Sequence, residues 1–317
     1  MQYSGNLVTF QIGKESSYGA KAIPTQQIAI SSESLKPIYN KVDEGLATGG
    51  RGEGKSQTMG RRASGNISTL MRPDMGLILE LVCGNKSVEG TEEPYTHTYT
   101  ASSPMTYRPS ATLIIDRGAG VYAYPGSKIN SIALSASAGD YAKLDIEFNA
   151  KSQNEGTKAS LGKTEKKAFR FAGAKMKMGN AEAADITSIK INWNNNDDVE
   201  TQTTGTGENY LEPQHGVRQI TIDTEQVWNA QAKSMIEEYY ETDETVSIEA
   251  IFTSDEKMND SEETPYQMKV LIPYAQCTDA TANMGSPTEF MKQTMSWKAI
   301  DNLSDELCTI TLINDEE

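Results

Sequence analysis

The chain has 317 residues, a length that allows two domains of ordinary size, each with its own core. Its formal net charge of −15 is unevenly distributed: residues 1–160 carry 16 Lys and Arg against 15 Asp and Glu, whereas residues 161–317 carry 13 against 29. DNA-binding surfaces rely on Lys and Arg to displace counterions from phosphates, so this composition disfavours a sequence-specific DNA reader.

Hydropathy and cysteine usage set further limits. No run approaches 18 consecutive apolar residues, and residues 1–10 lack the basic region and the apolar stretch of a signal peptide. We therefore expect a soluble protein that is made in a cytoplasm and has no membrane partner. Cys83, Cys277 and Cys308 are too widely spaced for a disulfide framework or a zinc site, and we interpret them as buried or idle thiols.

Strand patterns dominate the chain. In the first half, apolar residues alternate with polar ones from Val8 to Ile12, Leu113–Ile115 form a buried-type run, and alternation returns between Ile129 and Phe148. The second half continues the pattern at Phe169, Phe171, Ile189, Ile191, Trp193, Val246, Ile248, Ala250, Val270, Ile272, Ile310 and Leu312.

Each half contains one expected helix. Residues Pro73–Cys83 suit a helix because proline fits the first helical turn, Leu77, Ile78 and Leu81 fall on one face, and Gly84 can end the element. Residues Gln226–Glu241 have similar spacing of their apolar side chains, with the glutamates left for solvent.

The second half repeats the plan of the first without repeating its residues. The segment GNIST at Gly65–Thr69 precedes the first helix, and ITIDT at Ile220–Thr224 precedes the second, 155 residues later. A repeat of this length indicates a duplicated domain. We predict a mainly β (α+β) fold of two tandem β-sandwich or barrel domains, residues 1–158 and 159–317, each with one flanking helix and a long loop.

The long loops are two polar, Gly-rich excursions, Asn40–Ser64 and Asn194–Val217. Compact domains seldom carry more than twenty structureless residues without a purpose. Plain disorder is one interpretation. Because the excursions recur at the same place in both halves, we favour the other, that they become ordered against a neighbouring subunit.

The first excursion contains Gly49–Ser56 (GGRGEGKS), which satisfies the P-loop pattern G-x-x-x-x-G-K-[ST]. A working P-loop needs a buried strand before it and a helix after it, so that backbone amides converge on the phosphates. Neither flank has that character. We interpret the motif as a coincidence.

No other segment contains a recognisable catalytic or metal-binding motif. His97 and His215 are isolated, and neither has a Cys or carboxylate at metal-ligand spacing. The carboxylate clusters fall in turns, where a solvated acidic surface is the ordinary explanation. We expect no enzyme activity, no cofactor and no metal.

The segment Ser32–Arg72, with ESLKP, then TGGR, then GNIST and a helix, is similar to the tail tube proteins of long-tailed bacteriophages, as is Tyr124–Asp140 (YPGSKINSIALSASAGD). The resemblance is strong in the first half and extends to the second only in layout. It implies a structural virion protein whose copies form hexameric rings, or trimeric pseudo-hexameric rings when one chain carries two tube domains. Stacked rings would form the viral tail tube, a conduit for DNA ejection.

The resemblance also implies partners and a place. Besides itself, the chain would meet a tape measure protein and the tail terminator or distal tail proteins, and DNA would pass transiently without being held. The homo-oligomer would be assembled in the host bacterial cytoplasm and end in the virion tail.

The excursions carry opposite charges, which suits the complementary edges that a closed ring requires. We expect basic and acidic side chains to meet across subunit or ring boundaries and to steer assembly. The candidates are Arg51, Lys55, Arg61, Arg62, Asp197, Asp198, Glu200, Glu208 and Glu212. A second hypothesis is a channel lined with acidic residues, for which Asp223 and Glu225 are guesses.

Three alternatives remain open at this point. The first is a different virion part, either a distal tail or hub protein or the inner tube of a contractile injection particle. The second, a P-loop NTPase, is disfavoured. A carbohydrate-binding β-sandwich would need exposed aromatic platforms, yet aromatic residues are only 7% of the chain.

Overall fold

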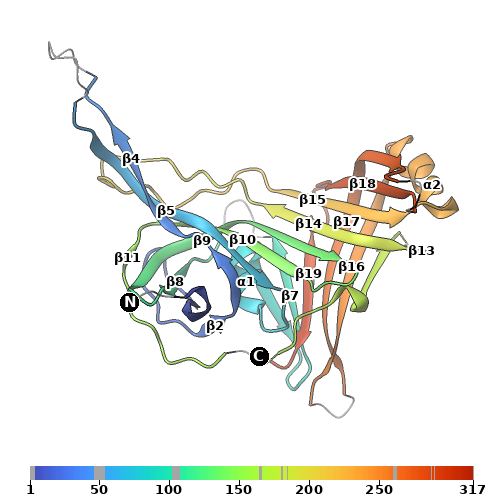
Figure 1. Ribbon diagram of the computed structural model, residues 1–317, viewed down its shortest axis with the longest axis horizontal. Helices are drawn as coiled ribbons and strands as arrows, with labels where there is room; N and C mark the ends of the chain where they lie inside the picture. Colours follow the sequence, from blue (N-terminus) through green and yellow to red (C-terminus); the bar gives the residue numbers. More distant parts are fainter. Residues whose placement is uncertain are drawn as a thin grey trace.

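The computed structural model describes residues 4–45, 54–101, 108–163, 166–179, 181–183, 185–259, 263–286, 288 and 290–316 (Figure 1). Within these residues the fold is mainly β, with two α-helices, as predicted. Most strands belong to one wide, twisted sheet that crosses the molecule.

The first half pairs its strands in the order β5–β10–β9–β8–β1–β2. The long strand β9 has two sets of partners: up to Ser127 it pairs with β8, and beyond it with β10. The change falls at Gly126, whose φ of 66° favours glycine. The bounds are β1 (Thr9–Lys14), β2 (Gln26–Ile28), β5 (Gln57–Leu70), β8 (Ala111–Asp116), β9 (Val121–Ser137) and β10 (Lys143–Ala150), with β11 (Asn154–Glu155) beside β9.

The second half repeats this order as β15–β18–β17–β16–β12–β13. Its long strand, β17, changes partners in the same way, since its first part pairs with β16 and its last part with β18. The bounds are β12 (Ala174–Met178), β13 (Ala181–Glu182), β15 (Gln219–Val227), β16 (Thr245–Lys257), β17 (Pro265–Asn283) and β18 (Lys292–Ala299). The division between residues 158 and 159 stays a prediction.

Strand β14 (Ile186–Asn194) joins the halves, because it lies between β15 and β9. In the first half the corresponding strands are β3 (Ile30–Glu33) and β4 (Lys36–Val42), which pair with β5 as β14 pairs with β15. On the outer side, β19 (Thr309–Asn314) links β17 to β7 (Tyr95–Ala101), which pairs with β6 (Gly84–Glu89). The sheet of one chain is not closed into a barrel.

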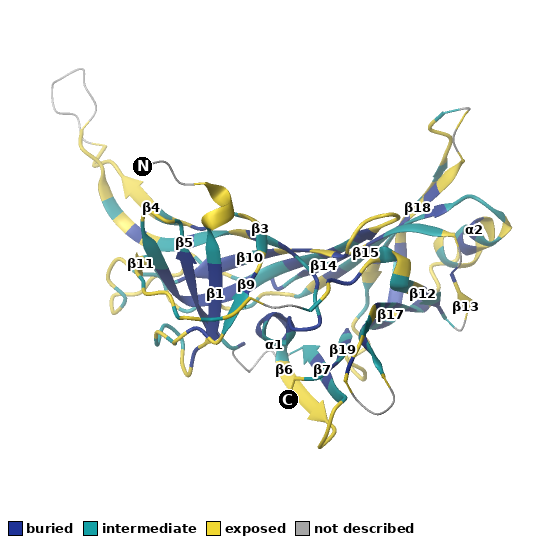
Figure 2. Ribbon diagram, turned by 60° about the horizontal axis from the view of Figure 1, so that its bottom comes forward, coloured by how far each residue is buried: buried dark blue, intermediate teal, exposed yellow. Residues whose placement is uncertain are grey.

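Both expected helices form, although each begins later than the sequence suggests. Helix α1 (Gly76–Cys83) starts three residues after Pro73 and packs beneath the sheet with five of its eight residues buried (Figure 2). Helix α2 (Ala230–Met235) starts after Asn229, whose side chain accepts a hydrogen bond from the Ala232 amide, and continues as the π-helical turn η3 (Ile236–Tyr240).

Two local expectations need correction. The described part of the first excursion is not a structureless loop, since β4 extends to Val42 and β5 begins at Gln57; together they form an arm that leaves the body of the molecule (Figure 1). Phe171 does not continue a strand but opens a short 3₁₀ turn, η2 (Phe171–Gly173). Elsewhere the predicted alternation places side chains such as Phe10, Ile146 and Phe148 in the core.

Candidate assembly surface

The sheet has several open edges, and two of them, one on each half, lie at the places that β14 and β9 occupy at the junction between the halves. Among the described residues, β3 and β4 pair only with β5, and residues 279–283 of β17 pair only with β18. An open edge presents unpaired backbone donors and acceptors, so it can accept a further strand.

The two halves of the chain meet where β14 pairs with β9, and this internal junction shows how such edges pack when they are paired. Strand β14 pairs with β9 over residues Ser188–Asn194 and Ser131–Ser137, with Ile189 opposite Ala136 and Ile191 opposite Leu134. In this junction Ile189 is 3% exposed and Ala136 2%. The junction is therefore packed like the rest of the core.

Beyond β14, the second excursion is fastened to the first half by a buried ion pair. Arg108 Nη2 lies 2.6 Å from Asp197 Oδ2, and these two side chains are 1% and 0% exposed. The Asp197 amide donates to Asn130 Oδ1 at 2.9 Å. Burial of this kind is tolerated because each charge has its partner.

A second pair lies beside it. Lys128 Nζ is 2.6 Å from Glu212 Oε1, and the lysine side chain is 1% exposed. Desolvation lowers the pKa of Lys128 below its ordinary value, although the hydrogen bond that Lys128 donates to Glu212 opposes that shift. Asp197 and Glu212 thus tie the excursion to the chain's own first half.

The outer part of the excursion runs along the arm. The Arg61 amide donates to the Glu208 carbonyl at 2.8 Å, and Gln202 donates to the Met59 carbonyl at 3.0 Å. Gly60 allows the close approach, because a Cβ there would lie 2.3 Å from the Tyr210 hydroxyl. The arm and the excursion thus support each other.

The predicted charged residues have different surroundings. Arg61 and Arg62 lie within 4 Å of Glu208 and Glu200 of the same chain, at 3.8 and 3.6 Å respectively. Asp198 and Lys55 are exposed, and Arg51 lies outside the described residues. Contact of these groups with another copy stays a prediction. Sequence reasoning missed Arg108 and Lys128; the available signal was Lys128 in a pattern otherwise typical of a buried strand.

One face of the wide sheet is polar and hollowed. A hollow of about 470 Å³ lies over β10, β9 and β14. Small polar side chains alternate there with five carboxylates and four lysines across the face: Asp145, Glu147, Asp223, Glu225, Asp279, Lys143, Lys190, Lys292 and Lys298.

Asp223 and Glu225 both lie on this polar face. Asp223 accepts a hydrogen bond from Ser296 at 2.7 Å, and Glu225 pairs with Lys292 at 2.8 Å. The Lys292 hydrogen bond, followed by that of Thr187, lowers the pKa of Glu225. With four lysines against five carboxylates, the face is nearly neutral rather than strongly acidic.

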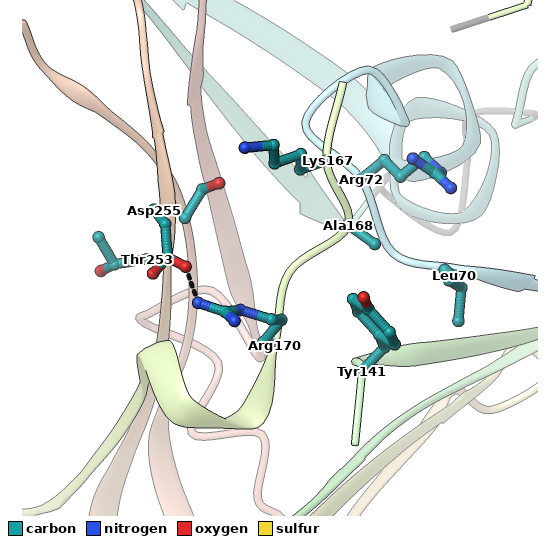
Figure 3. Close-up of a pocket in the computed structure, with 9 residues that line it drawn as sticks. Leu70, Arg72, Tyr141, Lys167, Ala168, Arg170, Thr253 and Asp255 are labelled. Atoms are coloured by element: carbon teal, nitrogen blue, oxygen red, sulfur yellow. Dashed lines mark ion pairs between the residues drawn. The ribbon is translucent and has the colours of Figure 1, made fainter. Parts of the chain in front are cut away.

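A second hollow, of about 410 Å³, lies between the halves at the end of β5 (Figure 3). Residues 166–170, the linker just before η2, run along this hollow. Arg170 reaches from the linker to Asp255 on β16 and forms an ion pair with it, while Tyr141 faces the linker from the turn after β9. The Ala142 amide donates to the Phe169 carbonyl at 2.9 Å. These contacts hold the linker against both halves.

The described flanks of Gly49–Ser56 do not form a nucleotide site. Strand β4 precedes the motif, and strand β5, not a helix, follows Lys55 and Ser56. The helix N-terminus on which a P-loop relies is therefore missing from the described flanks. Across the described ranges, no group of three or more His, Cys, Asp or Glu side chains could hold a metal.

These features define a protein of one wide β-sheet with open strand edges on both halves. The sequence model of a family described as phage tail tube protein matches residues 5–299, and the chain belongs to that family. The match spans both halves and confirms the resemblance noted in the sequence. A search of curated proteins found no match.

Family membership makes the chain a structural component of the virion tail, one that self-assembles into the tail tube. In the part of the chain that the structure covers, no helix is long and apolar enough to cross a membrane.

Proposed function

We propose that copies of this chain join edge to edge into a closed ring, that rings stack into a tube, and that DNA passes along the tube during ejection. The observation that carries the proposal is the pair of open edges on a chain whose halves already join through equivalent strands. Three copies would present six like units around a ring.

The repeated pairing order gives the register between copies. Ile30 occupies on β5 the place that Ile189 occupies on β15, opposite Thr69 and Thr224 respectively. Ala282 of β17 corresponds to Ala136 of β9. We therefore expect Ile30 of one copy to lie opposite Ala282 of the next.

Burial supports this register. Ile30 and Ala282 are only half-buried in one chain, whereas their counterparts Ile189 and Ala136 are fully buried at the internal junction. A ring contact would cover the first pair as the internal junction covers the second. The apolar area removed from water would add to the strand hydrogen bonds.

The hollowed polar face of the sheet would line the channel. With near-balanced charges and small polar side chains, it offers DNA few unpaired cations, and each neutralised phosphate would otherwise add a salt-dependent grip. The tape measure and the terminator or distal tail proteins are the further partners that we propose from the family, with assembly in the host cytoplasm.

Negative-stain electron microscopy of concentrated purified protein tests the proposal. We expect open-ended hollow cylinders with a regular axial repeat. Protein that remains monomeric would refute it, and single rings that never stack would favour a hub protein instead.

A further inference from the structure

An acidic hollow of about 300 Å³ lies beside the start of α1. Asp74, Glu80 and Glu316 line it, against one lysine, Lys86. Glu80 also pairs with Lys14. The carboxylates come from the chain after β5, from α1 and from the chain after β19.

Two buried side chains in this hollow each leave one polar atom without a hydrogen-bond partner among the described residues. Asp74 is 5% exposed, and its Oδ1 has no hydrogen-bond partner within the described ranges. His97 is 2% exposed, and the same holds for its Nδ1. Unpaired buried polar atoms are costly, so such atoms in a hollow point to a missing ligand.

The polar atoms in the hollow determine which kind of ligand fits. His97 Nε2 lies 2.8 Å from Asn314 Oδ1 and 2.7 Å from the Glu316 carbonyl. Asn314 Oδ1 and the Glu316 carbonyl are both acceptors, so His97 Nε2 is the donor in these contacts. The carboxylate oxygens that line the hollow, including the unpartnered Oδ1 of Asp74, suit a cationic hydrogen-bond donor such as an ammonium or guanidinium group.

The arm, formed by β4 and the start of β5, carries ammonium groups at the end of β5 that lies away from Asp74. Lys41 and Lys55 are exposed on β4 and just before β5, and no described residue forms an ion pair with either. Strand β5 runs from the arm to Leu70, four residues before Asp74. Copies stacked head to tail along the direction of β5 would bring the arm of one towards the Asp74 end of the next.

We propose that the Asp74 hollow is a socket for an arm lysine, Lys41 or Lys55, from a second copy in the adjacent ring. This inference rests on the proposed stacking of rings. The socket places the contact between stacked rings in the first half of the chain, at a different surface from the strand edges that close each ring.

Charge variants test the socket. Asp74→Asn keeps the shape of the side chain, and Lys41→Glu with Lys55→Glu changes only exposed groups. We expect each variant to form rings as the wild type does, by native mass spectrometry. Tubes should need at least about a tenfold higher protein concentration, because the lost contact recurs in every copy. Combining all three changes should add little to the lysine pair alone.

Lys163→Glu with Lys175→Glu is the matched control and should leave tube length unchanged. Unaltered tubes in either test variant would overturn the socket, as would lysine variants that block stacking while Asp74→Asn does not. Wild-type protein that forms no rings would instead defeat the proposed function.

Discussion

At the scale of single residues, Asp197 has the clearest energetic role. Its carboxylate is buried against Arg108, so Asp197→Ala would leave the guanidinium buried without its partner. We expect a loss of about 3–5 kcal/mol in the free energy of unfolding, measured with denaturant. Changing both residues, Arg108→Met with Asp197→Leu, should cost less than the two single changes together.

The neighbouring Asp198 provides the control. Asp198 is exposed, and among the described residues its carboxylate accepts hydrogen bonds only from the Thr201 hydroxyl and the Glu200 amide. Asp198→Ala should cost about 1 kcal/mol or less. Equal losses at both positions would contradict the importance of the buried pair.

The sequence could place Asp197 in an acidic excursion but could not supply its partner. Arg108 is 89 residues away along the chain, and no local pattern links the two. The expectation of contact with another copy came from the recurrence of the excursions and from their opposite charges, and neither distinguishes a contact within the chain from one between chains.

At the scale of elements, Glu249 on β16 connects the strands on either side. Its Oε2 lies 2.9 Å from Lys177 on β12, and its Oε1 pairs with Lys269 on β17. The Lys269 hydrogen bond, assisted by Lys177, lowers the pKa of Glu249 below its ordinary value of 4.5.

A lowered carboxyl pKa stabilises the fold above the unfolded pKa, and this stabilisation is lost as the pH falls through the folded value. Glu249→Gln should therefore cost about 1 kcal/mol at pH 7, and the difference from wild type should fade in acid. Thermal melts from pH 7 to pH 3 measure it. The matched variant Glu182→Gln, at an exposed pair with Lys175, should show no such trend.

Strands were more predictable than the ends of helices. Alternation locates β10 and β14 because one face of each is buried. Gln226 and Val227 were expected to be helical, yet they end β15, since pairing with β14 and β18 outweighs local helical spacing. The arm was missed because β4 and the start of β5 have polar side chains on both faces, which gives no periodic signal.

At the scale of the whole molecule, exposed charges on the arm and excursion should influence how fast copies meet more than how tightly they hold. Arg61 and Glu208 are each about half exposed, so salt screens their attraction. Raising salt should slow polymerisation, followed by light scattering, more than it shortens finished tubes. Equal sensitivity of both would show that the charges hold the tube together.

Cross-linking of Ile30→Cys with Ala282→Cys tests the central claim most directly, that the open edges of neighbouring copies pair in the register of the internal junction. Under mild oxidation we expect covalent bonds between copies that end at one closed ring size on a non-reducing gel. Ile30→Cys with Thr281→Cys, whose second thiol lies on the opposite face of β17, should link poorly. Cross-linking that is absent in the first variant, or equally efficient in both, would contradict the account.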